Sequence, residues 1–436
     1  MKKVLTLTLA VVAVIAWTLP ASALENEFGG YWRTRFFTQQ QFSGDNRDES
    51  GDKSQVDTRT RLYYTAKIND NLKFVNKFEF DAVWGDDELG DVGADGKVFE
   101  IKNSYVDWTM GSLNAKVGIQ GFLANRGFSI DDDASGAKLI YTVADGIYLP
   151  FSWYRVDEGY DQDNGDDTDL SDLNDGDLDV LTLAPLFQLN KNIKINPTYM
   201  YMHSDDAWEL EFGNGTQLED AEFSDVDVHT LALNMDASFT MGSIWFTGAF
   251  QTGEMEVDGN DQDVEAYLVA LGGEMDMEAM NLMAGDVHGQ FFYASGDDDA
   301  DDDDIEQWLS WPGASYYWSE IMGYGIFDFQ ASNNSPADGI SNIWAVNLGA
   351  TVKPMDKLKV AFDVWYANLA EDIIVADGTK QDELGTELDL VITYEVVQNL
   401  NLDLVGAYLF AGDATTENSP DDANPYEIGA RLSLSF

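Results

Sequence analysis

The chain has 436 residues, no cysteine, 24 Lys and Arg residues and 79 Asp and Glu residues, which give a formal net charge of −55 at neutral pH. This charge excludes sequence-independent nucleic-acid binding, because phosphate repels it. The lack of cysteine excludes disulfide frameworks, thiolate zinc sites and cysteine nucleophiles. Apolar residues make up 44% of the chain and aromatic residues 13%, which is too many for a disordered acidic protein.

Residues 1–23 predict a secretory signal peptide. Two lysines precede an apolar run from Val4 to Trp17, and the segment ends in an A-x-A motif at residues 21–23, the pattern of a signal that is removed after export. The run is shorter than a comfortable membrane span, which disfavours the alternative of an anchor helix. We therefore expect residues 24–436 to form one mature domain.

The rest of the chain shows the alternation of β-strands. No uninterrupted apolar stretch of 18 residues follows residue 23, which excludes a helical membrane protein. Apolar residues instead occupy every second position from Tyr426 to Phe436, and similar segments occur at residues 72–84, 358–366, 386–396 and 400–410. Period two is typical of strands whose two faces meet different solvents. The aromatic end of the chain resembles the assembly signal of outer-membrane barrels, which implies the barrel-assembly machinery as a partner.

The connections between these segments are alternately short and long. Short connections with the composition of tight hairpins lie at residues 69–71, 110–112, 144–146, 190–192, 240–242, 277–279, 354–356 and 398–399. Long polar ones lie at residues 43–54, 85–97, 124–136, 157–177, 204–225, 254–263, 295–340, 371–384 and 412–424. Together they predict an all-β fold, a transmembrane antiparallel up-and-down β-barrel of about 18 strands, in the outer membrane of a Gram-negative bacterium. Residues 98–108 break the alternation and predict a β-bulge.

Charge is distributed unevenly along this barrel. Most acidic residues fall in the long loops, which predicts an acidic crown outside the cell, while basic residues cluster between residues 33 and 138. A charge that faces lipid at mid-membrane costs about 2–4 kcal/mol, so the alternation predicts that charged strand residues face the lumen. The predicted basic lumen residues are Arg33, Arg35, Arg59, Arg61, Lys67, Lys73, Lys77, Lys116 and Arg431, with Arg126 in an adjoining loop. The predicted acidic lumen residues, which lie beside them, are Asp363, Glu387, Asp389, Glu395 and Asp403.

Two interpretations of these lumen charges remain open. In the first, the charges hydrate the pore and pair with one another. In the second, they sort solutes, because close like charges such as Arg33 with Arg35 and Arg59 with Arg61 repel and so suggest a site for an anionic group.

Three segments resemble the opening of the alginate-export family of outer-membrane porins. They are Tyr31–Phe37, Asp57–Leu62 and Asn71–Asp81, and the resemblance covers about residues 30–126. It implies an 18-stranded barrel whose arginine-rich lumen passes an anionic polysaccharide, with Arg33, Arg35, Arg59 and Arg61 in the conduit. The acidic wall and crown depart from this pattern, because they repel a polyanion.

The connection at residues 295–340 is the longest. It opens with an acidic run from Asp297 to Asp304 and continues with many aromatic residues. Three arrangements remain open: a constriction inside the barrel, an outside hairpin with its own core, or two further strands. The acidic run offers oxygen ligands for Ca²⁺, with Asp297, Asp298, Asp299, Asp301 and Asp302 as candidates, although nonspecific screening by divalent cations is the preferred interpretation.

Catalysis has little support, because His203, His229 and His288 lie far apart in the sequence and no phosphate loop or zinc spacing occurs. We expect no enzyme and no cofactor apart from the candidate Ca²⁺. The sequence predicts a porin for passive, charge-sorted diffusion of small hydrophilic solutes or anionic saccharides. The alternative functions are a dedicated polysaccharide exporter and a barrel sheath around a partner protein. Expected partners are outer-membrane lipid and these solutes, and the oligomeric state stays open.

Overall fold

The computed structural model describes residues 24–86, 99–157, 177–204, 208–209, 222–257, 259–299, 302–375 and 377–436. The predicted signal peptide at residues 1–23 lies outside them, as do most of the predicted loops at residues 85–97, 157–177 and 204–225. No helix among the described residues is long and apolar enough to cross a membrane.

The described residues form strands that belong to one sheet. The strands are β1 (Glu25–Gln40), β2 (Lys53–Asn69), β3 (Leu72–Val83), β4 (Glu100–Met110), β5 (Leu113–Ala124), β6 (Ile130–Ala144), β7 (Ile147–Asp157), β8 (Leu178–Leu183), β9 (Leu186–Asn190), β10 (Ile193–Ser204), β11 (Trp208–Glu209), β12 (Glu222–Phe239), β13 (Gly242–Val257), β14 (Asn260–Asp276), β15 (Gly285–Ala294), β16 (Asp304–Ile305), β17 (Ile343–Met355), β18 (Leu358–Ile374), β19 (Lys380–Val397), β20 (Leu400–Ala411) and β21 (Tyr426–Ser435). Two short helical turns are η1 (Asn125–Gly127) and α2 (Asp413–Thr416).

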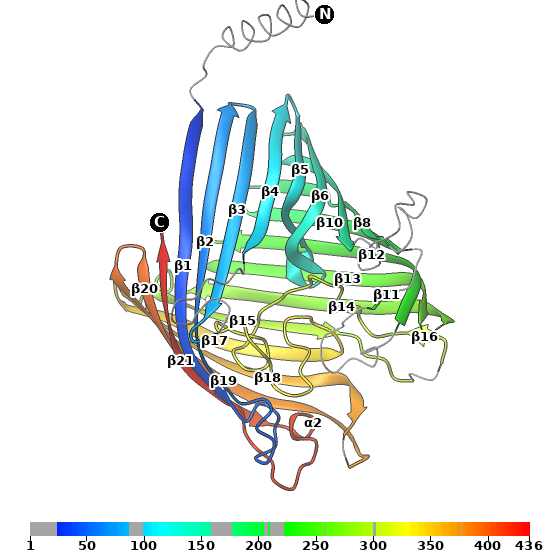
Figure 1. The fold of residues 1–436 in the computed structure, drawn as a ribbon, viewed down its shortest axis with the longest axis vertical. Coiled ribbons are helices and arrows are strands. Elements are labelled where there is room, and N and C mark those ends of the chain that lie inside the picture. Colours follow the sequence, from blue (N-terminus) through cyan, green and yellow to red (C-terminus); the bar gives the residue numbers. More distant parts are fainter. Residues whose placement is uncertain are drawn as a thin grey trace, which may run out of the picture.

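These strands build the wall of a closed antiparallel barrel with 18 strands (Figure 1). Neighbours in the chain pair with each other, and β1 pairs with both β2 and β21, which closes the sheet. Both β8 and β9 pair with β7 and β10, so they are two halves of one wall strand, interrupted where Pro185 cannot donate a ladder hydrogen bond. β11 and β16 are two-residue strands within long connections. The predicted fold class and strand number are therefore confirmed.

The connections agree with the prediction except at three loops. Each predicted short turn is present, and the one after β14 extends to residue 284. The loops predicted at residues 124–136, 254–263 and 371–384 are too long. The flanking strands extend into these segments, so the observed loops comprise only residues 125–129, 258–259 and 375–379. The acidic residues in these segments suggested loops. The strands nevertheless continue beyond the hydrocarbon core of the membrane, where water solvates carboxylates that face outward. The predicted bulge is confirmed, since the register between β3 and β4 skips Lys102.

The polarity of the two faces reverses along β12 and β13, although every side chain keeps the face that its parity gives it. In the halves next to the short turns, Leu231 and Phe250 are exposed on the outside while Thr247 is buried inside. In the halves next to the long connections, Val228 is buried inside and Glu254 is exposed on the outside. Because hydrocarbon rejects an outward charge, this reversal marks the outer edge of the membrane-spanning zone.

The connection between β15 and β17, residues 295–342, folds into the barrel, and we call it the lumen loop (Figure 1). Its Trp308, Trp311, Ile321 and Phe327 are at most 1% exposed, because they pack against inward-facing residues of the wall. Gln251 on β13 fixes the loop by exchanging hydrogen bonds of 2.9 and 3.0 Å with the Leu309 backbone. Of the three open arrangements, the structure therefore shows the constriction inside the barrel.

Candidate functional site

Strand register places five arginines side by side on the inner wall, and we call Arg33, Arg35, Arg59, Arg61 and Arg431 the arginine cluster. β1 pairs with β2 so that Arg33 lies opposite Arg59. β1 also pairs with β21 so that Arg35 lies opposite Arg431. The closure of the barrel therefore joins residues from the two ends of the chain into one basic surface.

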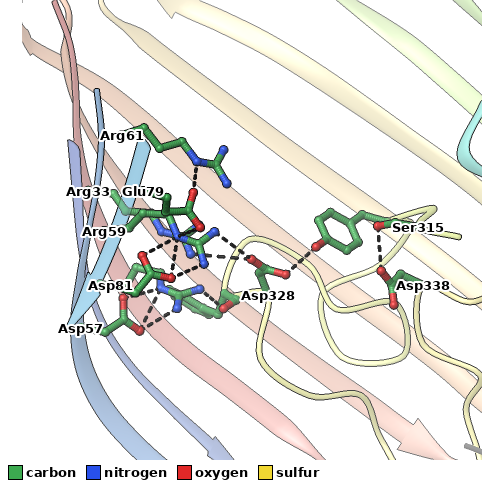
Figure 2. A network of polar contacts seen from close by, with 12 residues as sticks. Arg33, Asp57, Arg59, Arg61, Glu79, Asp81, Ser315, Asp328 and Asp338 are labelled. Atoms are coloured by element: carbon green, nitrogen blue, oxygen red, sulfur yellow. Dashed lines mark hydrogen bonds and ion pairs between the residues drawn. The ribbon is translucent and has the colours of Figure 1, made fainter. Parts of the chain in front are cut away.

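Carboxylates on neighbouring strands neutralise most of this cluster (Figure 2). Two arginines bind both oxygens of a carboxylate through two nitrogens, a geometry that strengthens charge-assisted hydrogen bonds. The pairs are Arg35 with Asp57 at 2.8 and 2.6 Å, Arg59 with Asp81 at 2.8 and 2.5 Å, Arg61 with Glu79, and Arg431 with Asp403 at 2.9 Å. Glu79 also lies 3.3 Å from Arg59 Nε, so one buried carboxylate relieves the repulsion between Arg59 and Arg61.

Arg33 has a different partner. Its Nη2 lies 3.6 Å from Asp328 Oδ2 of the lumen loop, while no residue that the structure describes forms a hydrogen bond with its buried Nε. The same Asp328 oxygen lies 3.7 Å from Arg59 Nη1, and the Tyr317 hydroxyl donates to the other Asp328 oxygen (Figure 2). A carboxylate of the lumen loop therefore lies between two arginines of the wall, at longer distances than the wall carboxylates.

Backbone groups anchor the lumen loop on both sides of this contact. On one side, Arg35 donates to the Phe327 carbonyl, and the Phe327 ring stacks on Phe37 with centroids 4.9 Å apart. On the other side, the Ile321 and Met322 N–H groups donate to the two oxygens of Glu387 at 2.6 and 2.9 Å. The loop thus bridges the basic and acidic walls of the lumen.

Glu320 contributes a titratable group to this bridge. Its side chain is buried, and its carboxylate accepts a 2.8 Å hydrogen bond from Ile326 N. Burial raises the pKa of Glu320 to about 7, and repulsion from Glu387 adds to the effect although the Ile326 hydrogen bond opposes it. Burial removes water from the carboxyl group, and the loss of hydration disfavours the charged form of any buried acid.

Two cavities meet at Arg33. One, of about 690 Å³, lies between the lumen loop and the wall of β13 to β19, and both basic and acidic side chains line it: Arg33, Arg431, Glu274, Glu320, Asp328, Asp363 and Asp389. The other, of about 240 Å³, lies beside β1, β2 and β3 and is also lined by Arg33. Arg33 therefore borders both cavities, whereas Asp328 borders the larger one.

The other predicted basic residues lie in different surroundings. Lys67 pairs with carboxylates near the start of β1. Arg126, in η1, lies 2.8 Å from Asp236 and stacks over the Trp245 ring at 5.0 Å. Lys73, Lys77 and Lys116 form no ion pair within the part of the chain that the structure describes, and Lys116 lies over the Tyr105 ring at 5.6 Å.

The predicted acidic residues lie in four different settings. Glu387 and Asp389 hold the lumen loop, and Asp403 pairs with the arginine cluster. Asp363 Oδ1 lies 2.9 Å from His288 Nε2, whose other ring nitrogen lies 2.7 Å from Asp286. Glu395 lies further along β19 on the same face as Glu387.

The candidate Ca²⁺ ligands lie at the start of the lumen loop, except that Asp301 is outside the described residues. Among the residues that are described, no group of three or more His, Asp or Glu side chains is placed to hold a metal ion. The Ca²⁺ site stays a prediction.

Sequence reasoning placed Asp403 beside the basic wall but missed the other partners of the arginine cluster. Asp57, Glu79 and Asp81 share the inward parity of the arginines and lysines on β2 and β3, and this parity was the available signal. Asp328 carried no such signal, because it lies in an irregular segment.

Comparison with known proteins supports the fold and the family. The family model described as alginate export matches residues 180–427, a different part of the chain from the resemblance at residues 30–126. No curated protein matches the chain.

Solved structures with the same fold include the outer membrane protein OprD from Pseudomonas aeruginosa, with 12% identity, coverage of 94% of both chains and a TM-score of 0.55. OccAB4 from Acinetobacter baumannii shows 11% identity, covers 96% of this chain and 100% of its own, and has a TM-score of 0.54. OccAB2 from the same organism shows 10% identity, covers 94% and 98%, and has a TM-score of 0.56. These identities show a shared fold alone, whereas the family model spans more than half of the 436 residues. The chain therefore belongs to the alginate export family, an outer-membrane family of β-barrel proteins.

Proposed function

We propose that this protein is an outer-membrane porin through which small hydrophilic solutes diffuse passively, sorted by the charges of the lumen. The observation that carries the proposal is Asp328 of the lumen loop, which lies between Arg33 and Arg59 at the edge of the larger cavity. A solute in either cavity meets Arg33, whose buried Nε has no hydrogen-bond partner among the described residues. The fold shared with the Occ and OprD outer-membrane proteins supports the same general function.

Ion selectivity in planar lipid bilayers tests the proposal. A charge about 10 Å from a passing ion changes its energy by roughly 1.7 kcal/mol at an effective dielectric constant of about 20. We therefore expect the double variant Arg59→Ala, Arg61→Ala to raise the cation-to-anion permeability ratio by about tenfold at low salt. A silent channel in the wild type, or unchanged selectivity in the variant, would contradict the proposal.

A charge-neutral variant provides the matched control. Arg59→Ala with Asp81→Asn removes the same guanidinium together with its bidentate partner, so the net charge of the wall stays constant. We expect its permeability ratio to remain close to that of the wild type. A shift as large as that of the arginine double variant would show that pore shape, and not charge, sets the selectivity.

The family favours a second candidate, the passage of an anionic polysaccharide. The lumen loop fills much of the wall-lined space, so this candidate requires the loop to make room for a polymer. Uronate oligomers added to a bilayer with open channels distinguish the two functions. Long current blocks whose duration grows with oligomer length support the exporter, and brief length-independent blocks support the porin.

We also propose that residues 1–23 are a signal peptide that is removed on export. The basic start, apolar run and A-x-A motif support this assignment. Sequencing of the N-terminus of protein purified from outer membranes tests it, and we expect the mature chain to begin at Leu24. An intact Met1 on membrane-embedded protein would contradict the assignment.

A further inference from the structure

The larger of the two cavities at Arg33 has an acidic end, where one carboxylate is incompletely bonded. Asp389 on β19 lines this cavity and is only 5% exposed. Its Oδ2 accepts a long hydrogen bond of 3.4 Å from Glu320 N, while no residue that the structure describes forms a hydrogen bond with its Oδ1. A buried acceptor without a donor costs free energy, most of all when it is charged. This oxygen therefore calls for a proton or for a ligand that donates to it.

Asp389 differs in this respect from the other acids that line the cavity. Each of the others accepts a hydrogen bond from a described donor, and the pairs are Glu274 with Ser243, Glu320 with Ile326 N, Asp328 with Tyr317, and Asp363 with Asn347. Glu427 on β21 also has an oxygen without a described partner, but it does not line this cavity. Asp389 is therefore the carboxylate that a ligand in the cavity can complete.

The arginines that line the cavity are engaged with other carboxylates. Arg431 lies 2.9 Å from Asp403, and Arg33 faces Asp328. Glu387, two residues from Asp389 on the same face of β19, uses both of its oxygens to accept backbone N–H groups of the lumen loop. The acidic end therefore carries an excess of negative charge, which attracts a cation.

A hydroxyl group and two aromatic rings complete the acidic end. Ser319 lines the cavity and is 4% exposed, and its Oγ has no hydrogen-bond partner among the described residues. Trp318 and Trp365 also line the cavity, with ring centroids 5.1 Å apart. Aromatic rings attract organic cations, and two free acceptors match the N–H donors of an ammonium group. The acids that are described here do not form a group placed to hold a metal ion.

We propose that the acidic end of the larger cavity binds the ammonium group of a small organic cation. Asp389 and Ser319 accept its N–H hydrogen bonds, and the two tryptophans pack against its carbon skeleton. The cavity volume of about 690 Å³ lies within the range of about 300–1,000 Å³ for pockets that hold small molecules. The charge preference of this site is opposite to that of the arginine cluster. The inference rests on the proposed function, because a solute reaches this cavity through the lumen.

Calorimetric titration of the detergent-solubilised barrel tests the site with three probes of similar shape. They are benzylammonium, the neutral benzyl alcohol, and benzyltrimethylammonium, which keeps the charge but has no N–H donor. We expect benzylammonium to bind at least tenfold more tightly than benzyl alcohol and several-fold more tightly than the quaternary cation, because hydrogen bonds between charged groups are the strongest ones.

Variants assign the binding to the two acceptors. We expect Asp389→Asn to weaken benzylammonium at least tenfold and Ser319→Ala to weaken it several-fold. Asp145→Asn, which makes the same change in an exposed turn, is the matched control and should bind like the wild type. Retained electrophoretic heat-modifiability shows that each variant is folded. If Asp389→Asn does not fold, undiminished binding by Ser319→Ala decides against the inference.

Several results would overturn the inference: no benzylammonium binding by the wild type, equal binding of either of the other probes, or undiminished binding by Asp389→Asn. Absence of binding would assign a proton to Asp389 in place of a ligand. Bilayer conductance of the same preparations separates this inference from the proposed function. Open channels without benzylammonium binding remove the site and leave the porin. Benzylammonium binding without conductance removes the porin and leaves the site.

Discussion

At the scale of single residues, the lumen keeps its arginines in place with carboxylates instead of leaving them as free positive charges. Two bidentate pairs and the bridge through Glu79 hold the guanidinium planes against the wall. Such partly buried ion pairs fix the orientation of the side chains more than they stabilise the fold. Asp328 reaches the arginines from the lumen loop and not from the wall (Figure 2). We therefore expect its loss to change the passage of solutes without disturbing the wall.

Replacement of Asp328 tests that distinction. In Asp328→Ala, Arg33 and Arg59 lose a shared anion at 3.6 and 3.7 Å. We expect single-channel conductance to rise and the cation-to-anion permeability ratio to fall several-fold, because positive charge at the constriction becomes available to anions. Asp421→Ala, in an exposed loop outside the lumen, is the control. An equal change in both variants would mean that the acidic crown, and not this contact, controls permeation.

A glycine on β17 permits another lumen contact. Gly349 lies opposite both His288 and Asp363, and a Cβ there would come within 2.1 Å of Asp363 Oδ1 and 2.3 Å of His288 Nε2. We expect Gly349→Ala to separate these side chains and to lower the free energy of unfolding by about 1–3 kcal/mol, as other overpacked sites do. Urea unfolding in lipid vesicles measures the loss. Gly406→Ala, where a Cβ meets nothing within 4 Å, should lose much less, and equal losses would refute the steric explanation.

At the scale of elements, the lumen loop is fixed by packing on the wall and carries a pH dependence through Glu320. The pKa of Glu320 is raised to about 7 by burial, so the neutral form fits the docked loop. A raised acid pKa means that docking is strongest below the ordinary pKa of about 4.3 and weakens as the pH rises through 7. The full effect is roughly 3 kcal/mol between these limits.

Bilayer recordings at pH 5.5 and pH 8.5 test this dependence. We expect the wild-type channel to show more frequent gating events at pH 8.5, when ionised Glu320 weakens the docking of the loop. Glu320→Gln cannot ionise and should gate equally at both values, whereas Glu278→Gln, in an exposed turn, should behave like the wild type. Persistent pH dependence in Glu320→Gln would assign the titration to another group.

The strands and the lumen loop also differ in how well the sequence predicts them: it predicts the barrel wall better than the contacts of the arginine cluster. Alternation and turn composition were sufficient for the number of strands, because both are local. The pairing of Arg59 with Asp81 depends on an irregularity between Lys67 and Asn69, next to the tight turn, which shifts the register of β2 and β3 by one residue. A shift of one residue exchanges the two faces of a strand. The lumen loop has no period, so its entry into the barrel and the position of Asp328 could not be predicted.

At the scale of the whole molecule, the sequence predicts an acidic exterior around a lumen of mixed charge. The formal net charge is −55, while the arginine cluster faces carboxylates on the inner wall. Outward carboxylates such as Glu254 begin where the outer face changes from apolar to charged, so we expect the acidic crown to start at the membrane edge. Two fields therefore act on an approaching ion, one from the crown and one from the lumen.

Ionic strength separates these fields from short-range contacts. The screening length is about 10 Å at 0.1 M salt and about 3 Å at 1 M, so the field of an arginine reaches across a narrow lumen only at low salt. We expect the roughly tenfold difference in permeability ratio between the wild type and the Arg59→Ala, Arg61→Ala variant to shrink below about twofold at 1 M KCl. Reversal potentials measured at both salt concentrations give these ratios. A difference that survives at 1 M would show that the arginines act by contact or by shaping the pore, because a screened field no longer reaches the ions that pass.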